Sequence, residues 1–325
     1  MTTMSYADAI CRATREAMTR DDRVIVLGQG LKDSGIWGTV PREREHQLLE
    51  TPLSEDAMTG LAIGMAQAGL RPITIDIRMD FALLRMNQIV NMASKHVMWG
   101  GPRRCPLVMR RVVGRSWGQG PQHSQALHAF FMHVPGLRVV APVTAQDAYD
   151  CMREALTLDI PTIVMEHRLL HKTMGPVDAT TTTVHEHTGS DLTIVGISHA
   201  AWECHRAAEM LNGESIDMID MVRLSPHDID PVANSVRRTG RLLVVDNGWL
   251  ACGASAEILA RVAEAFPGTQ MKRMGFLARP CPPTQAGEHD FYPRASTIAA
   301  LAHTMLHGRP AVFTDPPATE FKGPF

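Results

Sequence analysis

Short apolar runs alternate with segments of helical periodicity along almost the whole chain. The runs predict buried β-strands at residues 24–27, 72–77, 106–110, 137–141, 161–165, 192–197, 216–221, 242–245 and 271–274. Apolar residues at three- and four-residue intervals predict helices at residues 6–19, 54–70, 81–95, 124–132, 144–158, 200–211, 232–237, 254–265 and 293–306. The alternation predicts the α/β class, with mostly parallel sheets covered by helices on both faces.

One segment interrupts this alternation. Residues 174–190 hold glycine, proline and four consecutive threonines without apolar periodicity, which predicts a linker. We therefore expect a first domain at residues 1–175, a linker at 176–190 and a second domain at 191–325. A chain of 325 residues is long enough for two such domains, each with its own core.

Composition narrows the class of protein. The formal charge of −2 gives no reason to expect a nucleic-acid or anionic-membrane partner. No basic, apolar leader opens the sequence, and no apolar run approaches the roughly 18 residues of a membrane helix. Six cysteines are scattered without a Cys-x-x-Cys pair, which is typical of small core residues in a reducing compartment. We expect a cytoplasmic protein.

The first candidate functional segment is residues 51–70. Ser54 is a suitable N-cap, its hydroxyl free to accept a backbone N–H, and Glu55 falls in the first turn, where the helix dipole favours negative charge. The glycines Gly60 and Gly64 would let another backbone approach. The apolar stripe expected behind them consists of Ala57, Leu61, Ala62, Met65 and Ala66. From these residues alone, an ordinary capped core helix is the favoured interpretation.

A second candidate is His123, in a loop rich in glycine and proline that runs into a helical segment. A histidine there can present its ring to a ligand and titrate near neutrality, and a histidine bonded to backbone is an equally good interpretation. No metal site is expected from the four histidines that follow, His128, His133, His167 and His171, because their spacing does not place two rings on one helical face. Two interpretations stay open for Arg110, Arg111 and Arg115: they bind an anionic group of a substrate, or they lie on a solvated surface.

Several motifs occur in one order and at characteristic spacing. They are Thr51-Pro-Leu-Ser-Glu55, Met79-Asp-Phe81, Gln88-Ile-Val-Asn91, Pro121-Gln-His-Ser-Gln125, His133-Val-Pro-Gly136 with Val139-Val-Ala-Pro142, Val164-Met-Glu-His-Arg-Leu-Leu170 and Gly253-Ala-Ser-Ala-Glu257. Because these motifs occur together and in this order, the chain resembles the beta subunit of the thiamine-diphosphate-dependent first component of 2-oxo acid dehydrogenase complexes, in the transketolase-like superfamily. The resemblance implies a transketolase-like pyrimidine-binding domain followed by a transketolase C-terminal-like domain.

The resemblance also implies roles for individual residues. Glu55 would share a proton with the cofactor's aminopyrimidine nitrogen and so favour the imino tautomer, whose nitrogen deprotonates the thiazolium carbon. Phe81 would stack against the pyrimidine, and Leu53 would lie beside the cofactor. His123 would face the substrate, assisting proton transfer or binding its carboxylate. For Phe81 an ordinary core phenylalanine is the alternative interpretation.

The family's motif for the diphosphate and Mg²⁺, a Gly-Asp-Gly with an asparagine downstream, does not occur in the sequence. In two-chain members that half-site lies on the alpha subunit. The resemblance therefore implies thiamine diphosphate with Mg²⁺ shared with an alpha partner, activity only with that partner, self-association of beta chains and an α2β2 assembly.

The sequence also departs from the family pattern. The first strand is followed by Gly28-Gln-Gly30 rather than Gly-Glu-Asp, and His128 replaces a usual glutamate. Leu158 and Ile160 stand where acidic and asparagine side chains hold a monovalent cation in the family. These departures indicate a divergent member and leave a lipoyl transacylase partner open.

Three functions follow from the resemblance. The first is a beta subunit of an enzyme that decarboxylates a 2-oxo acid and transfers the resulting acyl or aldehyde unit. The second is the C-terminal half of a split transketolase, for which Arg110, Arg111 and Arg115 would form the basic pocket that sugar phosphates need. The third is a non-catalytic scaffold of the same fold, against which the retained Glu55, Phe81 and His123 argue.

Overall fold

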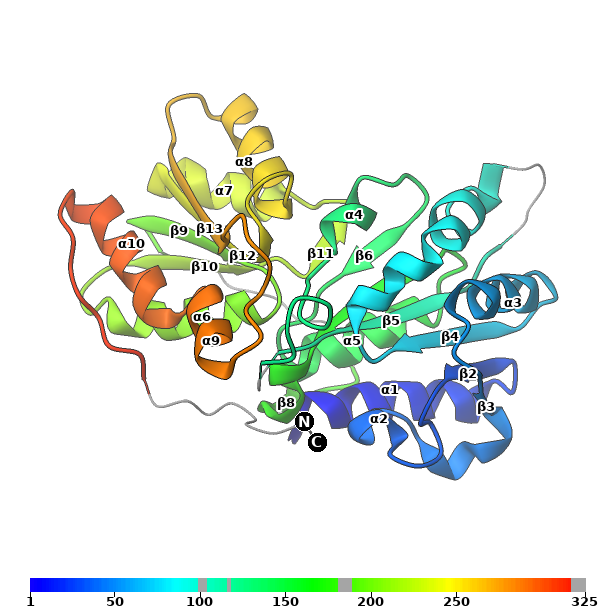
Figure 1. The fold of residues 1–325 in the computed structure, drawn as a ribbon. Coiled ribbons are helices and arrows are strands. Elements are labelled where there is room, and N and C mark those ends of the chain that lie inside the picture. Colours follow the sequence, from blue (N-terminus) through cyan, green and yellow to red (C-terminus); the bar gives the residue numbers. More distant parts are fainter. Residues whose placement is uncertain (99–103, 116–117, 181–188, 317–325) are drawn as a thin grey trace.

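The computed structural model describes residues 1–98, 104–115, 118–180 and 189–316, which fold into two α/β lobes lying side by side (Figure 1). The first lobe is built around a seven-stranded sheet and the second around a four-stranded sheet. The expected two-domain α/β architecture is confirmed. The residue boundaries of the domains and linker stay predictions, and residues 181–188 of the expected linker lie outside the described part of the chain.

The first sheet has the strand order β11-β6-β7-β5-β4-β2-β3. Its strands are β2 (Val24–Gly28), β3 (Leu48–Glu50), β4 (Arg71–Asp76), β5 (Val108–Val113), β6 (Arg138–Val140), β7 (Thr162–His167) and β11 (Arg223–Ser225). All neighbours are parallel except β11, which pairs antiparallel with β6. Because β11 comes from the second half of the sequence, the second half of the chain completes the first sheet.

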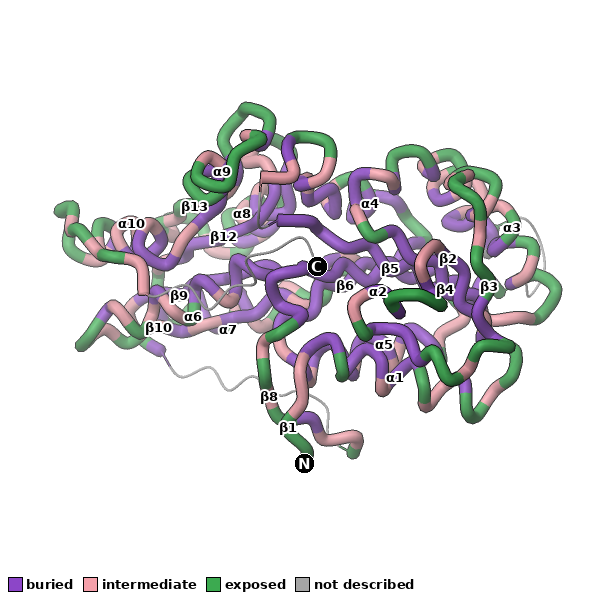
Figure 2. Tube along the Cα trace, turned by 60° about the horizontal axis from the view of Figure 1, so that its bottom comes forward, coloured by how far each residue is buried: buried purple, intermediate pink, exposed green. Residues whose placement is uncertain are grey.

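Two hydrophobic clusters cover the faces of this sheet. On one face, α1 (Tyr6–Arg20) and α5 (Ala145–Ala155) bury residues such as Ile10 and Met152. On the other face lie α3 (Glu55–Gln67), the 3₁₀ segment η2 (Met79–Arg85) and the π-helical segment η3 (Asn87–Ala93). The second cluster continues into the second lobe, so the lobes share one apolar core. Figure 2 shows buried strands running between partly exposed helices in both lobes.

The second sheet is parallel, with the order β10-β9-β12-β13. Its strands are β9 (Leu192–Gly196), β10 (Ile216–Asp220), β12 (Arg241–Trp249) and β13 (Gln270–Phe276). The helices α6 (His199–Met210) and α10 (Ala295–His307) pack on one face. The helices α7 (Asp230–Thr239) and α8 (Ala254–Ala265) pack on the other, toward the core shared with the first lobe (Figure 1).

Shorter elements make up the rest of the two lobes. They are β1 (Thr2–Ser5), α2 (Gly35–Gly38), η1 (Arg42–Gln47), η4 (His96–Met98), α4 (Ala129–Met132), η5 (Arg168–Lys172), β8 (Met174–Val177) and α9 (Gln285–Phe291). The strands β1 and β8 form a separate antiparallel pair. The segment expected to be irregular from Met174 onward therefore begins with a strand, whose partner lies at the opposite end of the first lobe's sequence.

Two expected helices differ from the sequence pattern. The segment 81–95 is not one α-helix but the 3₁₀ and π turns of η2 and η3. Of residues 124–132, only α4 is helical. The backbone N–H groups of Gln125 and Leu127 donate to the side chains of Asp80 and Met79, so they do not enter a helical ladder. Residues 279–289, which lie between the predicted strand at 271–274 and the predicted helix at 293–306, contain the start of α9, where the Thr284 side chain accepts the Gly287 N–H.

In the described part of the chain, no helix combines the length and the apolarity that crossing a bilayer requires. All six cysteines are free thiols. Five are buried, as expected for core residues, whereas Cys252 is exposed. It lies in the turn after β12 and has a φ of 55°.

Candidate active site

The candidate residues Glu55, Phe81 and His123 follow β3, β4 and β5 at the carboxyl ends of the strands of the first sheet, and we call them the candidate edge. From β2 the chain moves outward to β3, whereas β4 leads to β5 on the other side. Such a reversal of strand order opens a crevice at the carboxyl ends of the strands, where ligands of open α/β sheets bind. The turn before Glu55 lies over this end of β2, since the Thr51 N–H donates to the Gly28 carbonyl at 2.9 Å.

A buried arginine fixes the beginning of α3. The guanidinium of Arg85 contacts both carboxylate oxygens of Asp76 at the end of β4. It also donates to the Glu55 carbonyl at 2.7 Å and to the Thr59 hydroxyl at 2.9 Å. Arg111 adds a second guanidinium 3.0 Å from Asp76. Glu55 is therefore held at the strand edge by its backbone, while its half-buried side chain remains available.

The helix α3 differs from the expected capped core helix in three ways. Ser54 occupies the N-cap position, but its side chain makes no capping hydrogen bond. Of the expected stripe, Ala62 and Ala66 are buried, whereas Ala57 and Leu61 are exposed. Within the described residues, neither expected close backbone approach occurs, since a Cβ at Gly64 would meet nothing within 4 Å and one at Gly60 only the Gln88 side chain. Part of the apolar surface of α3 therefore remains uncovered by the described chain.

The structure brings Phe81 and His123 together. Their rings meet edge to face, with centroids 5.6 Å apart, and both side chains are half-buried. Leu53, by contrast, is 79% exposed. A half-buried phenylalanine beside a loop histidine differs from an ordinary core phenylalanine, because part of its ring is free to contact another molecule.

Asp80 is a buried acid next to Phe81, and sequence reasoning gave it no role. Its Oδ1 accepts the Gln125 side-chain N–H at 2.8 Å and the Gln125 backbone N–H at 3.3 Å. Burial raises the pKa of Asp80, opposed by these bonds and by the nearby His123. The available signal was the sequence itself, an acid between two apolar residues in Met79-Asp-Phe81.

The arginines considered for anion binding have structural roles. Arg110 and Arg111 are fully buried. Arg110 pairs with Glu166 and donates to the Thr39 hydroxyl. Burial opposes ionisation of Glu166, but the Arg110 guanidinium lowers its pKa to about 2. Arg115 is also buried and lies over the Tyr292 ring, 4.2 Å from its centroid. Neither an open basic pocket nor a solvated face is formed by these three residues.

Three of the four histidines considered for a metal site, His167, His171 and His133, contact other groups of this chain. His167 stacks on His199 at 4.7 Å, and burial, with the neighbouring His199, lowers the pKa of His167 well below its usual value. His171 lies 3.3 Å from the buried Glu166, whereas the exposed His133 donates from its ring Nδ1 to the Ala129 carbonyl at 3.2 Å. Among the described residues, no group of three or more His, Cys, Asp or Glu side chains could hold a metal ion.

Polar contacts join the two lobes along a buried seam. His128 Nε2 lies 3.0 Å from an oxygen of Asp246. The Tyr292 hydroxyl donates to the Ser124 carbonyl at 2.9 Å. Glu288 accepts from the Ser124 hydroxyl and from the Gly118 N–H. We call His128, Ser124, Asp246, Glu288 and Tyr292 the interlobe seam, and it holds the segment that follows His123 against the second lobe.

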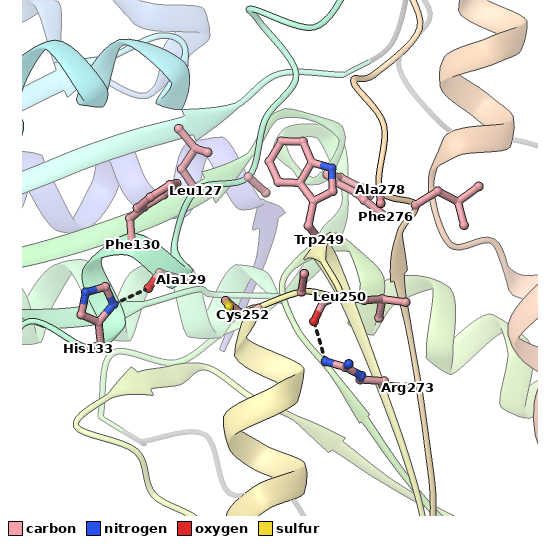
Figure 3. A pocket seen from close by; sticks show the side chains of 15 residues that line it. Leu127, Ala129, Phe130, His133, Trp249, Leu250, Cys252, Arg273, Phe276 and Ala278 are labelled. Atoms are coloured by element: carbon pink, nitrogen blue, oxygen red, sulfur yellow. Dashed lines mark hydrogen bonds between the residues drawn. The ribbon is translucent and has the colours of Figure 1, made fainter.

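A separate apolar pocket of about 710 Å³ lies between α4 and the ends of β12 and β13 (Figure 3). Phe130, Trp249 and Phe276 supply aromatic walls, and the exposed Cys252 lies at its rim. The pocket contains none of the candidate-edge residues. The labelled polar side chains bond within the chain, as Arg273 does to the Leu250 carbonyl at 2.5 Å.

Comparison with known proteins places this geometry in a family. Residues 2–173 match the model of the transketolase pyrimidine binding domain, and residues 181–298 match that of the transketolase C-terminal domain. The pyruvate dehydrogenase E1 component subunit beta of Rickettsia felis is 36% identical over 279 residues, covering 81% of this chain and 85% of that protein. The chain belongs to the family of E1 component beta subunits.

Other members show how widely this beta-subunit family matches the chain. The acetoin:2,6-dichlorophenolindophenol oxidoreductase subunit beta of Cupriavidus necator is 34% identical over 331 residues, covering 94% of this chain and 98% of that protein. The human mitochondrial pyruvate dehydrogenase E1 component subunit beta is 32% identical over 285 residues, covering 80% and 78%.

A solved structure described as a split-gene transketolase, inactive beta4 tetramer, has a TM-score of 0.77 at 18% identity and covers 93% of this chain and 98% of that one. At this identity the likeness shows the shared fold alone.

Proposed function

We propose that this chain is the beta subunit of a heteromeric thiamine-diphosphate-dependent enzyme that decarboxylates a 2-oxo acid and transfers the acyl or aldehyde unit. The supporting observation is the candidate edge: Glu55 begins α3 at the carboxyl end of the sheet, where Phe81 and His123 also lie. When bound, thiamine diphosphate supplies the carbon nucleophile that attacks the substrate carbonyl.

The residues present suit the pyrimidine end of the cofactor. The Glu55 carboxyl, in the first turn of α3, can share a proton with a ring nitrogen of the pyrimidine. Phe81 offers part of its ring for stacking, Leu53 is exposed beside them, and His123 can bind or protonate a substrate. A partner surface would exclude water and so strengthen these interactions.

The diphosphate and Mg²⁺ would be held by an alpha subunit that carries Gly-Asp-Gly and a downstream asparagine, since this sequence has no such motif. The enzyme would be active only with that partner. The uncovered apolar residues of α3 support a partner surface there. Beta chains would pair through the second domain to give α2β2, and six free cysteines fit a cytoplasmic location.

A second candidate reaction has specific support. The beta subunit of the acetoin oxidoreductase matches almost the full length of the chain. Cleaving acetoin would use the same cofactor and the same half-site to break a carbon–carbon bond beside an oxygen-bearing carbon. A split transketolase is less well supported, because Arg110 and Arg111 are buried in ion pairs and cannot form its sugar-phosphate pocket.

The experiment that tests the proposal is reconstitution with the product of the adjacent open reading frame, if that frame encodes Gly-Asp-Gly. Dichlorophenolindophenol reduction would be followed with thiamine diphosphate, Mg²⁺ and a panel of pyruvate, branched 2-oxo acids, acetoin and xylulose 5-phosphate. We expect cofactor-dependent turnover with a 2-oxo acid. Turnover with acetoin alone would favour the second candidate, and no turnover with any member would overturn the proposal.

A further inference from the structure

Two segments from different parts of the sequence interlock beside His123. The first is Met79-Asp80-Phe81, at the beginning of η2. The second is the loop segment 123–127, between β5 and α4. Phe81 contacts the His123 ring, Asp80 binds Gln125, and the Met79 sulfur accepts the Leu127 N–H at 3.4 Å. Each residue of the first segment therefore contacts the second.

The Asp80 contact is the strongest of these and the most restrictive. A single oxygen, Oδ1, accepts both the backbone N–H and the side-chain N–H of Gln125, so it fixes that residue in position and in rotation. Asp80 is only 6% exposed, so water does not compete for the same donors. Gln125 is two residues from His123, and the chain between them has little freedom to move the ring independently.

The opposite side of His123 is closed by backbone. A Cβ at Gly114 would lie 2.5 Å from the His123 carbonyl oxygen, so the end of β5 leaves room for that carbonyl only because the residue is glycine. The His123 N–H donates to the Gly120 carbonyl at 3.2 Å. Ser124, the next residue, is held by Glu288 and Tyr292 of the second lobe. The Asp80 contact adds the restraint that comes from the segment carrying Phe81.

We propose that Asp80 is a positioning residue that fixes His123 against Phe81 by accepting both N–H groups of Gln125. The inference rests on the proposed function for its catalytic consequence, but the geometry of the contact is independent of it. What the site needs from Asp80 is an acceptor oxygen. A negative charge is not needed for either bond, and burial penalises that charge.

Because the acceptor oxygen and the negative charge of Asp80 can be separated by substitution, the conservative variant Asp80→Asn is informative. In Asp80→Asn, the side-chain amide oxygen can accept the same two bonds without the buried charge. Asp80→Ala removes both bonds. Gln125→Ala removes the side-chain bond and leaves the backbone bond. Asp22→Ala is the matched control, because Asp22 is a largely exposed aspartate far from the loop in sequence, with 87% of its side chain accessible.

The first measurement is hydrogen–deuterium exchange of the peptide spanning residues 121–127 in the purified full chain. We expect Asp80→Ala to raise its exchange by roughly 10-fold or more, Gln125→Ala to raise it by about 3-fold, and Asp80→Asn and the control to leave it unchanged. Wild-type exchange in Asp80→Ala would overturn the proposal. If Asp80→Ala fails to fold, the other two variants decide. Wild-type exchange in Gln125→Ala, or raised exchange in Asp80→Asn, would then overturn the proposal.

The second measurement is turnover of the reconstituted complex. Misplacing His123 should lower kcat by about 10–100-fold in Asp80→Ala with little change in KM for the cofactor, and Asp80→Asn should restore kcat to within about 3-fold of wild type. Asp80→Asn that keeps exchange protection but loses turnover would show that the charge matters and overturn the proposal. Absence of turnover in the wild-type complex would contradict the proposed function instead, while the exchange result still tests the contact.

Discussion

The candidate edge and the interlobe seam contain similar side chains, but they differ in how far these side chains are buried and hydrogen-bonded. In the seam, His128, Ser124, Asp246, Glu288 and Tyr292 are all 2% exposed or less, and they bond to one another or to backbone across the lobes. At the edge, Glu55, Phe81 and His123 are only half-buried, and Leu53 is 79% exposed.

The difference shows which region has its contacts within this chain and which region leaves side chains open to another molecule. The seam and the shared core give the two lobes a fixed relation without help from another molecule. The edge holds its backbone equally firmly, through Arg85 and Asp80, but leaves the reactive side chains open. We infer that this chain is stable without a partner, whereas its activity requires an assembly. Variants at the edge should therefore lose turnover without losing stability, and variants in the seam should do the reverse.

The largest effect is expected at Glu55. Glu55→Gln keeps the size of the side chain and removes the acid, so turnover of the complex should fall by about 10²–10⁴, the usual contribution of general acid–base catalysis. Cofactor binding should persist and the melting temperature should stay within a degree or two of wild type. Asp56→Asn, the same change at the next residue, is the control and should keep turnover. Near-wild-type turnover in Glu55→Gln would remove Glu55 from the mechanism.

A smaller effect is expected at His123. His123→Ala should lower turnover by about 10–100-fold while exchange of the thiazolium proton continues, because this histidine faces substrate in the proposal. Proton exchange measured by NMR beside turnover makes the comparison, with His133→Ala as the control at an exposed histidine. An equal collapse of both quantities would assign His123 to cofactor positioning.

The smallest effect is expected in the seam, and it concerns stability. Tyr292→Phe removes one buried hydrogen bond, to the Ser124 carbonyl, and should lower the free energy of unfolding by about 1–2 kcal/mol. Burial raises the pKa of Tyr292, so the unfolded chain ionises first, near pH 10, and wild-type stability falls as the pH rises beyond that point.

Urea unfolding at pH 7, 9 and 10.5 measures this effect. The advantage of wild type over Tyr292→Phe should be constant between pH 7 and 9 and shrink at 10.5. An advantage that grows with pH would contradict the assigned donor role of the hydroxyl.

Local patterns predicted much of the fold. The periodicity of residues 254–265 predicted the bounds of α8. The helix predicted at 144–158 is α5, and its first predicted residue, Thr144, is the N-cap, with Asp147 completing a capping box. Long-range partners were not predictable from these patterns. The strand β8 pairs with the amino terminus, and β11 crosses to the first sheet. Arg110 is buried in an ion pair with Glu166, and because Glu166 is 56 residues away in the sequence, local patterns did not reveal this pair.

The candidate site was predictable only in part. Periodicity alone favoured a capped core helix at Glu55, and it was the ordered motifs that pointed to a cofactor. Even so, Ser54 makes no capping hydrogen bond to α3. Residues 124–128 are not helical, and the backbone N–H groups of two of them, Gln125 and Leu127, donate to the side chains of Asp80 and Met79. A side chain from one segment competing for the backbone of another leaves no mark on local periodicity.

The central claim is that this chain supplies half of a cofactor site. Calorimetric titration of thiamine diphosphate and Mg²⁺ into the purified chain, with and without the Gly-Asp-Gly partner, tests it most directly. A diphosphate without metal ligands and partner donors would lose its hydration uncompensated, so we predict no appreciable binding to the chain alone and metal-dependent binding to the complex. Tight, Mg²⁺-dependent binding to the isolated chain would contradict the claim.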